Sequence, residues 1–273
     1  MKNKNSKTEQ QNKIYSLEKA RTYWSYPPCK TLGKKHTKEH AEKPNSFIKK
    51  LIEDEIRLRD EVEGTGTSRE IIADLIKNKG MKKVLDFGCG LGQEGLYFAK
   101  ECGVEVTFAD ISPSNIELTK RFPRIWNVNT KSSYIDNPLT ISFPEKFDLI
   151  MAIGVLHHTP QAKLIAANLR QFLNEDGFLI LMLYTKHHYA RRKVKTLADY
   201  ALKSEALPPA KIVNPYSDYY DVEKVKKVFE GYEIERNFTT NKETFGWYFL
   251  KKIERRYEKS IPVSDIYSSC IVR

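Results

Sequence analysis

Val84-Leu85-Asp86-Phe87-Gly88-Cys89-Gly90-Leu91-Gly92 joins an apolar segment to three glycines that are spaced two residues apart. The apolar residues are typical of a buried strand, and the pattern from Gly92 to Lys100 is typical of a helix. Glycine has no Cβ, so it adopts positive φ and allows a ligand to contact the backbone. A helix that begins after such a turn directs N–H groups toward that ligand. The stretch therefore predicts a binding loop for a nucleotide-like cofactor.

The glycines alone fit two sequence frames. One is the dinucleotide fingerprint Gly90-x-Gly92-x-x-Gly95. The other begins at Asp86 and reads Asp-x-Gly-x-Gly-x-Gly; we expect this carboxylate to face the cofactor site, where it would repel a pyrophosphate but attract a cation through a water or an amide. The second frame resembles motif I of the class I S-adenosylmethionine-dependent methyltransferases. In that frame Gly95 lies inside the helix, where alanine should be tolerated.

Three further segments are similar to the same family. A strand over 104–109 ends at Asp110, which we expect to be exposed in the empty site and to accept both hydroxyls of a cofactor ribose. Ser112 and Pro113 are typical of an N-cap and a first helical residue. A strand over Phe147–Ile153 runs into Gly154-Val155-Leu156-His157-His158-Thr159-Pro160, which resembles the segment after the fourth strand of these enzymes.

The order of these elements predicts an α/β fold: a Rossmann-like, doubly wound, seven-stranded sheet with an antiparallel last hairpin. We expect a helix over 162–173, a turn at 174–177, a strand over 178–184, a helix over 221–230, and hairpin strands over 232–237 and 247–253. Before the sheet we expect a helix over 46–62 and a second helix that opens at the capping box Thr67-Ser68-Arg69-Glu70 and closes at Gly80.

These boundaries predict three parts of the chain. Residues 1–45 form a basic arm, disordered over about 1–14, with an aromatic cluster; residues 46–254 form the methyltransferase domain; residues 255–273 form a basic tail. Within the domain, residues 185–220 are expected to be a substrate lid, with a basic helix over 186–202 and a proline-bearing loop over 207–214.

The resemblance implies S-adenosylmethionine as the cofactor, with S-adenosylhomocysteine as its product and no metal. An acid after the third strand usually approaches the adenine in this family, and Asp136 is the candidate here, although that strand is rich in polar residues. The resemblance thus predicts ten cofactor-binding residues: Asp86, Phe87, Gly88, Gly90, Gly92, Asp110, Ile111, Asp136, Ile153 and Gly154.

Methyl transfer requires few catalytic side chains, because the sulfonium of S-adenosylmethionine carries its own electrophilic methyl group. A base helps when the acceptor is a hydroxyl or a protonated amine. His157 and His158 are the catalytic candidates, since they stand at the carboxyl edge of the sheet. The favoured alternative gives them structural roles, with one capping the following turn and the other packing beneath the cofactor. The predicted substrate residues are Tyr23, Trp24, Tyr26, His157, Arg191 and Arg192.

The net charge of +11 is unevenly distributed. Residues 1–50 hold 13 Lys and Arg against 4 Asp and Glu, residues 51–184 hold 15 against 19, and residues 185–273 hold 18 against 12. The basic segments therefore flank the cofactor-binding body, where they could steer an anionic acceptor or simply form a solvated surface. We expect an acceptor that is a small or carrier-bound molecule, methylated at oxygen, as in the bacterial glycan and secondary-metabolite methyltransferases that the chain resembles.

No apolar run approaches the length of a membrane span, the N-terminus lacks the apolar core of a signal peptide, and the four cysteines have no metal-binding spacing. A cytoplasmic protein is expected. Two other interpretations stay open: an RNA-modifying methyltransferase, which the basic charge would suit, and a non-catalytic cofactor-binding protein or a nicotinamide oxidoreductase that uses the Gly90 frame.

Overall fold

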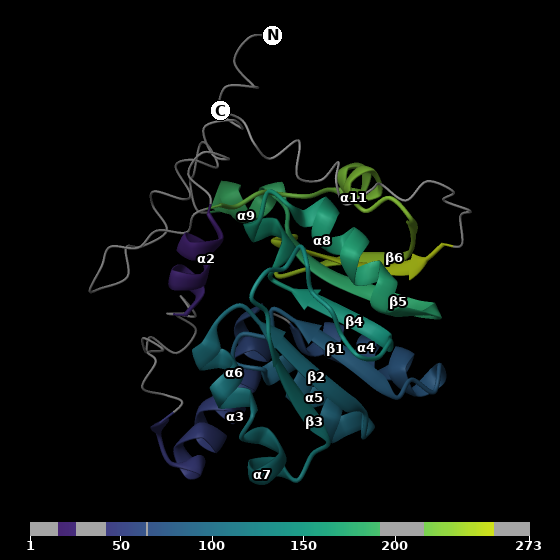
Figure 1. Ribbon diagram of the computed structural model, residues 1–273. Helices are drawn as coiled ribbons and strands as arrows, with labels where there is room; N and C mark the ends of the chain where they lie inside the picture. Colours follow the sequence, from purple (N-terminus) through teal and green to yellow (C-terminus); the bar gives the residue numbers. More distant parts are fainter. Residues whose placement is uncertain (1–15, 26–41, 64, 192–215, 254–273) are drawn as a thin grey trace.

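Seven strands form one mixed sheet in the computed structural model, which describes residues 16–25, 42–63, 65–191 and 216–253 (Figure 1). Their order across the sheet is β3-β2-β1-β4-β5-β7-β6. Strands β1 to β5 pair in parallel, and β7 runs antiparallel to both of its neighbours. The strands are β1 (Lys83–Phe87), β2 (Glu105–Asp110), β3 (Thr130–Tyr134), β4 (Phe147–Ile153), β5 (Leu173–Tyr184), β6 (Tyr232–Thr240) and β7 (Phe245–Lys252).

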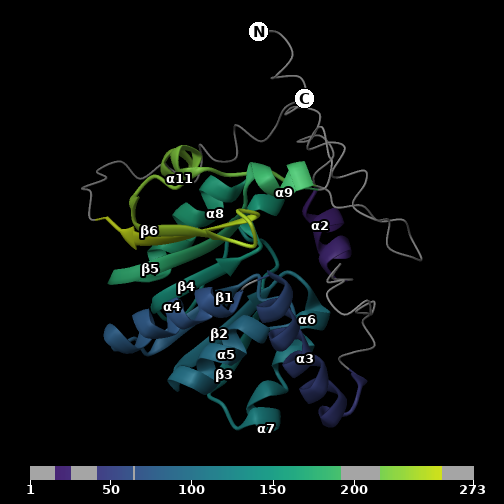
Figure 2. The same ribbon diagram turned by 180° about the vertical axis from the view of Figure 1, so that it is seen from behind.

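Helices cover both faces of the sheet, as the two opposite views in Figures 1 and 2 show. One buried apolar cluster packs α3, α4 and α5 against the strands and contains Ile52 and Ile72, while a second cluster packs α8 and α11 and contains Ile165 and Val225. The helices are α2 (Leu17–Trp24), α3 (Asn45–Glu63), α4 (Thr65–Asn78), α5 (Gln93–Cys102), α6 (Pro113–Thr119), α7 (Phe122–Trp126), α8 (Ala162–Leu169), α9 (Lys186–Arg191) and α11 (Val222–Val228), with short 3-10 turns η2 (Leu156–His158) and η3 (Arg170–Phe172).

The predicted fold class is confirmed: the sheet is Rossmann-like and ends in an antiparallel hairpin. The predicted strand over 147–153 coincides with β4. Ser112 caps α6 by accepting a hydrogen bond from the Asn115 N–H, and Pro113 is the first residue of that helix. These local signals are correct because each depends on backbone chemistry within a few residues.

Two local predictions are wrong. Helix α4 begins at Thr65, so the predicted capping box lies inside the helix, where the Ser68 hydroxyl donates to the Thr65 carbonyl oxygen at 2.7 Å. Strand β5 begins at Leu173, before the predicted turn, because Leu173 pairs with Phe147 across an irregularity in the β4–β5 register. Asn174 supports that irregularity by donating to the Asp148 carboxylate at 2.7 Å.

The polar third strand also has a structural explanation. Strand β3 stands at the edge of the sheet and pairs with β2 alone among the described strands. Its residues are exposed or half-buried, so polar side chains are stable there. A polar composition at this position therefore does not conflict with a strand.

Several predicted features lie outside the described residues: the 1–14 segment, Tyr26, Arg192, the 207–214 loop and the 255–273 tail. Of the predicted basic helix over 186–202, the structure describes α9, which ends at Arg191. Across the parts of the chain that the structure does describe, none of the helices combines the length and the apolar composition that crossing a membrane requires.

Candidate functional site

The glycine turn between β1 and α5 is built from backbone conformations that favour glycine. Gly88, Gly90 and Gly92 have φ values of +71°, +55° and +77°. A Cβ on Gly88 would lie 2.6 Å from a methyl group of Val155, and one on Gly92 would lie 2.8 Å from the ring of Phe122. A Cβ on Gly90, by contrast, would meet no atom within 4 Å. The turn is thus tightly packed at both ends and open at its middle glycine, as a loop that receives a ligand requires.

Asp110 holds this turn in place from the end of β2. One carboxylate oxygen accepts the Gly90 N–H at 2.8 Å, and the other accepts the Ser112 N–H at 2.7 Å. Burial raises the pKa of Asp110 to about 6, although the hydrogen bonds from Ser112 and Gly90 act in the opposite direction. The side chain is only 5% exposed, so the prediction of an exposed carboxylate is wrong. The Asn115 side chain and the Ile111 N–H also donate to this carboxylate, and both act to lower its pKa.

Asp86 lies beneath the turn and contacts α5. Its carboxylate accepts the Gly95 N–H at 3.0 Å, and its side chain is buried. Burial, followed by the negative charge of Glu94, raises the pKa of Asp86 to about 7. Its described hydrogen bond therefore supports the first turn of the helix from the interior of the protein.

Gly95 is more constrained than the sequence predicts. A Cβ at this position would lie 2.6 Å from the Phe108 ring, 2.8 Å from the Asp86 carboxylate and 2.9 Å from Val106. These atoms belong to the core, so they have little room to move. The prediction that alanine is tolerated at Gly95 is wrong for this steric reason, although the residue lies inside a helix as expected.

The end of β4 lies next to the glycine turn. Gly154 follows the strand with a φ of +77°, and its N–H donates to the Met182 carbonyl oxygen at 3.1 Å. Val155 then packs against Gly88. The structure thus brings the carboxyl ends of β1, β2 and β4 together, and with them the predicted residues Phe87, Ile111 and Ile153.

Asp136 follows β3 and contacts the N-terminal helix α2. Arg21 donates from Nη2 to the Asp136 carbonyl oxygen at 2.6 Å and to its carboxylate at 3.2 Å, and its guanidinium carbon lies 5.7 Å from the centre of the Tyr134 ring. The carboxylate of Asp136 remains largely exposed. No local sequence signal identifies Arg21 as a partner, because 115 residues separate the two positions.

Aromatic and imidazole rings stack at the ends of β4 and β5. The His157 ring lies 3.8 Å from Tyr184 and 4.1 Å from His158, measured between ring centres. Trp24 of α2 lies 4.7 Å from His158, and His188 of α9 stacks on Tyr184 at 3.7 Å. The predicted residues Trp24, His157 and His158 therefore meet, and Tyr184 and His188 join them without having been predicted as site residues.

Both histidines beside β4 are neutral at pH 7. Burial lowers the pKa of His158 to about 4, although the hydrogen bond between its Nδ1 and the Tyr216 carbonyl oxygen at 3.2 Å acts to raise it. Burial, with the neighbouring His158 and His188, lowers the pKa of His157 well below its usual value. Tyr23, another predicted substrate residue, is buried and packs edge-on against Trp24 at 4.8 Å. This side of the sheet edge is thus an uncharged, ring-lined region.

Residues 216–220 form backbone contacts with the chain beside these rings. The Asp218 N–H donates to the His157 carbonyl oxygen, and the Tyr220 N–H donates to the Tyr184 carbonyl oxygen, both at 2.8 Å. Among the described residues, no group of three or more His, Cys, Asp or Glu side chains is placed to hold a metal ion.

Comparison with known proteins matches one part of the chain. Residues 85–179, which contain the glycine turn, match the model of a methyltransferase domain. This match agrees with the predicted resemblance to the class I S-adenosylmethionine-dependent methyltransferases. The open middle of the turn beside Asp110 has room for a cofactor such as S-adenosylmethionine. The match to a methyltransferase domain favours the Asp86 frame over the dinucleotide frame.

Two curated relatives and one solved structure give the extent of the similarity. The chain is 29% identical over 100 residues to 2-methyl-6-phytyl-1,4-hydroquinone methyltransferase of Synechocystis, covering 36% of this chain and 30% of that protein. It is 29% identical over 128 residues to ubiquinone biosynthesis O-methyltransferase of Actinobacillus pleuropneumoniae, covering 45% and 54%. The chain thus spans about a third to a half of these relatives.

The fold is shared more widely than the sequence. The crystal structure of magnesium protoporphyrin IX methyltransferase from Synechocystis, solved with bound S-adenosylmethionine, superposes with a TM-score of 0.55 at 15% identity. The superposition covers 87% of this chain and 97% of that one. At this identity the similarity establishes the architecture, so the site residues are assigned from the geometry above.

Proposed function

We propose that the protein transfers the methyl group of S-adenosylmethionine to a hydroxyl oxygen of a small or carrier-bound acceptor. The observation that carries this proposal is the glycine turn, in which Asp110 holds the Gly90 N–H and the position of a Gly90 Cβ is open. A family match over the same residues supports it. The cofactor, when bound, supplies the methyl group already activated as a sulfonium.

The protein's own contribution is to hold and orient the two reactants. Asp110 would accept the ribose hydroxyls, Gly88 and Gly90 would contact the cofactor through their backbone, and Asp136 would approach the adenine amino group. Orientation of this kind supplies a large part of the rate in a direct displacement. The remaining residues proposed to contact the cofactor are Asp86, Phe87, Gly92, Ile111, Ile153 and Gly154.

The acceptor side is proposed to be the ring-lined region beside β4 and β5. Neutral imidazoles can accept a proton, so His157 and His158 are proposed to take the hydroxyl proton as the methyl group is transferred. The ring of Trp24 packs against His158, so an acceptor that reaches this histidine would have to displace the Trp24 ring. The relatives named for a hydroquinone and for ubiquinone biosynthesis support a small hydroxylated acceptor. The basic segments at 1–50 and 185–273 are proposed to favour an anionic one.

Calorimetric titration tests the cofactor assignment. The wild-type protein is expected to bind S-adenosylhomocysteine and not NAD. Asp110→Ala is expected to weaken that binding, because each hydrogen bond to a charged group contributes about 1.5–3 kcal/mol at most. An unchanged dissociation constant in this variant would contradict the ribose assignment, and binding of NAD alone would contradict the proposed function.

An RNA-modifying methyltransferase is the second candidate, favoured by the charge of the two basic segments. Filter binding with bulk RNA across a salt series separates the two proposals. Phosphate contacts make RNA affinity fall steeply with salt, so a steep fall favours the RNA candidate and weak, salt-independent retention favours a small acceptor.

A further inference from the structure

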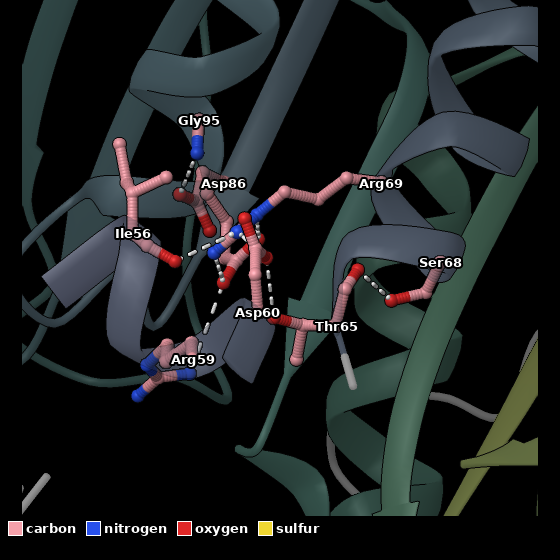
Figure 3. A network of polar contacts seen from close by, with 9 residues as sticks. Ile56, Arg59, Asp60, Thr65, Ser68, Arg69, Asp86 and Gly95 are labelled. Atoms are coloured by element: carbon pink, nitrogen blue, oxygen red, sulfur yellow. Dashed lines mark hydrogen bonds and ion pairs between the residues drawn. The ribbon is translucent and has the colours of Figure 1, made fainter. Parts of the chain in front are cut away.

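A network of buried charges connects α3, α4 and α5 behind the glycine turn (Figure 3). Arg69 of α4 is 1% exposed, and its Nε and Nη2 atoms donate to the two carboxylate oxygens of Glu94 in α5, each at 2.8 Å. Its Nη1 atom donates to the Asp60 carboxylate and, at 3.2 Å, to the Ile56 carbonyl oxygen, both in α3. Paired hydrogen bonds of this kind fix both direction and distance. One guanidinium group therefore links three helices.

The network ends at the first turn of α5, which adjoins the glycine turn. Gly92 caps this helix and has no side chain to accept its first N–H groups. Glu94 lies in the first turn and is followed by Gly95, whose N–H donates to Asp86. Asp86 of β1 and the Arg69–Glu94 pair thus hold the same helical turn from two directions. Movement of this turn would move Gly92 and the loop before it.

The charges in this region are balanced through Arg69. Burial opposes ionisation of Glu94, but the charge and hydrogen bonds of Arg69, with the charge of Arg59, outweigh it and lower the pKa of Glu94. Asp86 faces the negative charges of Glu94 and Asp110 and the positive charge of Arg59. Glu94 is therefore a carboxylate that Arg69 neutralises, and its charge acts on the neighbouring Asp86.

We propose that Arg69 is a positioning residue for the cofactor: through Glu94 it fixes the first turn of α5, and so the shape of the Gly88–Gly92 turn. The inference rests on the proposed function. Arg69, Asp60 and Ile56 all precede the matched segment 85–179, so this support comes from a part of the chain outside the matched methyltransferase domain.

The test compares two ion pairs by calorimetry with S-adenosylhomocysteine, at a temperature where thermal unfolding shows each protein to be folded. The double variant Arg69→Met with Glu94→Gln removes both buried charges together, so that Glu94 is not left as an unpaired buried carboxylate. Asp60 loses Arg69 but keeps the hydrogen bond from the Thr65 hydroxyl, and its side chain is 38% exposed. The matched control, Arg57→Met with Glu61→Gln, removes an exposed pair on α3. We expect the dissociation constant to rise about tenfold or more in the first variant, as for a loosened binding geometry, and to stay unchanged in the control.

A pH series supplies a readout that loss of stability alone would not move. Asp86 is one of the residues proposed to contact the cofactor, so its ionisation is expected to set the pH midpoint of S-adenosylmethionine binding. Glu94 raises the pKa of Asp86. The double variant, which neutralises Glu94, is therefore expected to move this midpoint to a lower pH. Arg69→Lys keeps the charge but not the paired hydrogen bonds, and should weaken binding by an intermediate amount; it also serves if the double variant does not fold.

The outcomes separate this inference from the proposed function. Wild-type protein that does not bind S-adenosylhomocysteine overturns both. Wild-type binding with an unchanged dissociation constant in folded Arg69 variants overturns the positioning role alone. Weaker binding with a fixed pH midpoint in the double variant also overturns it, because a general loosening of the fold then accounts for the loss.

Discussion

At the carboxyl ends of β1 and β2 the structure uses carboxylates and backbone N–H groups, whereas at the ends of β4 and β5 it uses neutral rings. Asp86 and Asp110 each accept hydrogen bonds from the turn or its helix. His157, His158 and Tyr184 instead contact one another through their ring faces and edges. In the proposed function, the first region would select a ligand by charge and backbone geometry, and the second would select one by shape and apolar contact. The same edge of the sheet thus contains two different environments, one polar and one lined with rings.

The largest expected effect separates two glycines within the first region. Gly88→Val should abolish binding of S-adenosylhomocysteine and lower the melting temperature strongly, because its Cβ would lie 2.6 Å from Val155. Gly90→Val should abolish binding with a smaller loss of stability, of about 1–3 kcal/mol for a strained backbone, since its Cβ has open space. Calorimetry with thermal unfolding checks both. Normal binding by Gly90→Val would show that no ligand occupies that space.

Gly95→Ala should have the next largest effect. The added methyl group contacts Phe108, Val106 and the Asp86 carboxylate, so we expect a loss of about 1–3 kcal/mol in the free energy of unfolding and weaker cofactor binding. Gly66→Ala is the matched control, because it also lies in a helix but its Cβ would be no closer than 3.6 Å to Asp60. Denaturant unfolding that ranks Gly95→Ala with Gly66→Ala would contradict this packing.

The buried carboxylates of the first region should make stability fall as pH rises. Asp86 has a folded pKa of about 7, above its ordinary value of 3.8, so the folded state holds a proton that the unfolded state releases between those values. Stability is therefore lost from about pH 4 to 7 and is constant above. Asp86→Asn should raise the free energy of unfolding relative to wild type at pH 8, by on the order of 2 kcal/mol, and less at pH 4.5.

Asp110 accounts for the pH dependence that should remain in Asp86→Asn, since burial also raises its pKa, to about 6. Chemical denaturation at the two pH values measures the effect. An Asn variant whose stability difference from wild type is the same at both would show that Asp86 is ionised throughout. No comparable change is expected from His157 or His158 between pH 7 and 8, because both are neutral over that range.

The smallest effect concerns the charge of the predicted basic lid after β5. Replacing Arg191, Arg192 and Lys193 by Glu should raise the acceptor KM by a few-fold, more at low salt than at high salt, as screening predicts. The dissociation constant of S-adenosylhomocysteine should not change, since the cofactor residues lie in the net-negative body. Loss of cofactor affinity with unchanged acceptor kinetics would place these residues on the cofactor side.

The two regions also differ in how far the sequence predicts them. The sequence from Asp86 to Ser112 identifies the first region, because its contacts are local and its glycines serve fixed backbone conformations. The second region joins Trp24, His157, His158, Tyr184 and the segment at 216–220, which meet only in the folded chain. Pairings such as Arg21 with Asp136 have no sequence spacing that identifies them.

Errors within the first region have a different cause. The sequence predicts an exposed Asp110 because this residue stands at the tip of a strand. It predicts that alanine is tolerated at Gly95 because this residue lies inside a helix. The environment of Asp110 depends on its contact with Ser112, and the space at Gly95 depends on the Phe108 ring. The partnership of Arg69 with Glu94 is similarly non-local, since the capping-box interpretation placed Arg69 only near the start of a helix.

The position of β7 has a consequence for synthesis of the chain. This strand is the last described one in sequence, yet it lies between β5 and β6. The apolar strand β5 therefore has an open edge until residues 245–252 have left the ribosome and paired with it. Unpaired apolar edges readily join other chains, so we expect the nascent protein to pass through an aggregation-prone stage that ends when β7 pairs with β5. A stop codon just before residue 245 would make that stage permanent.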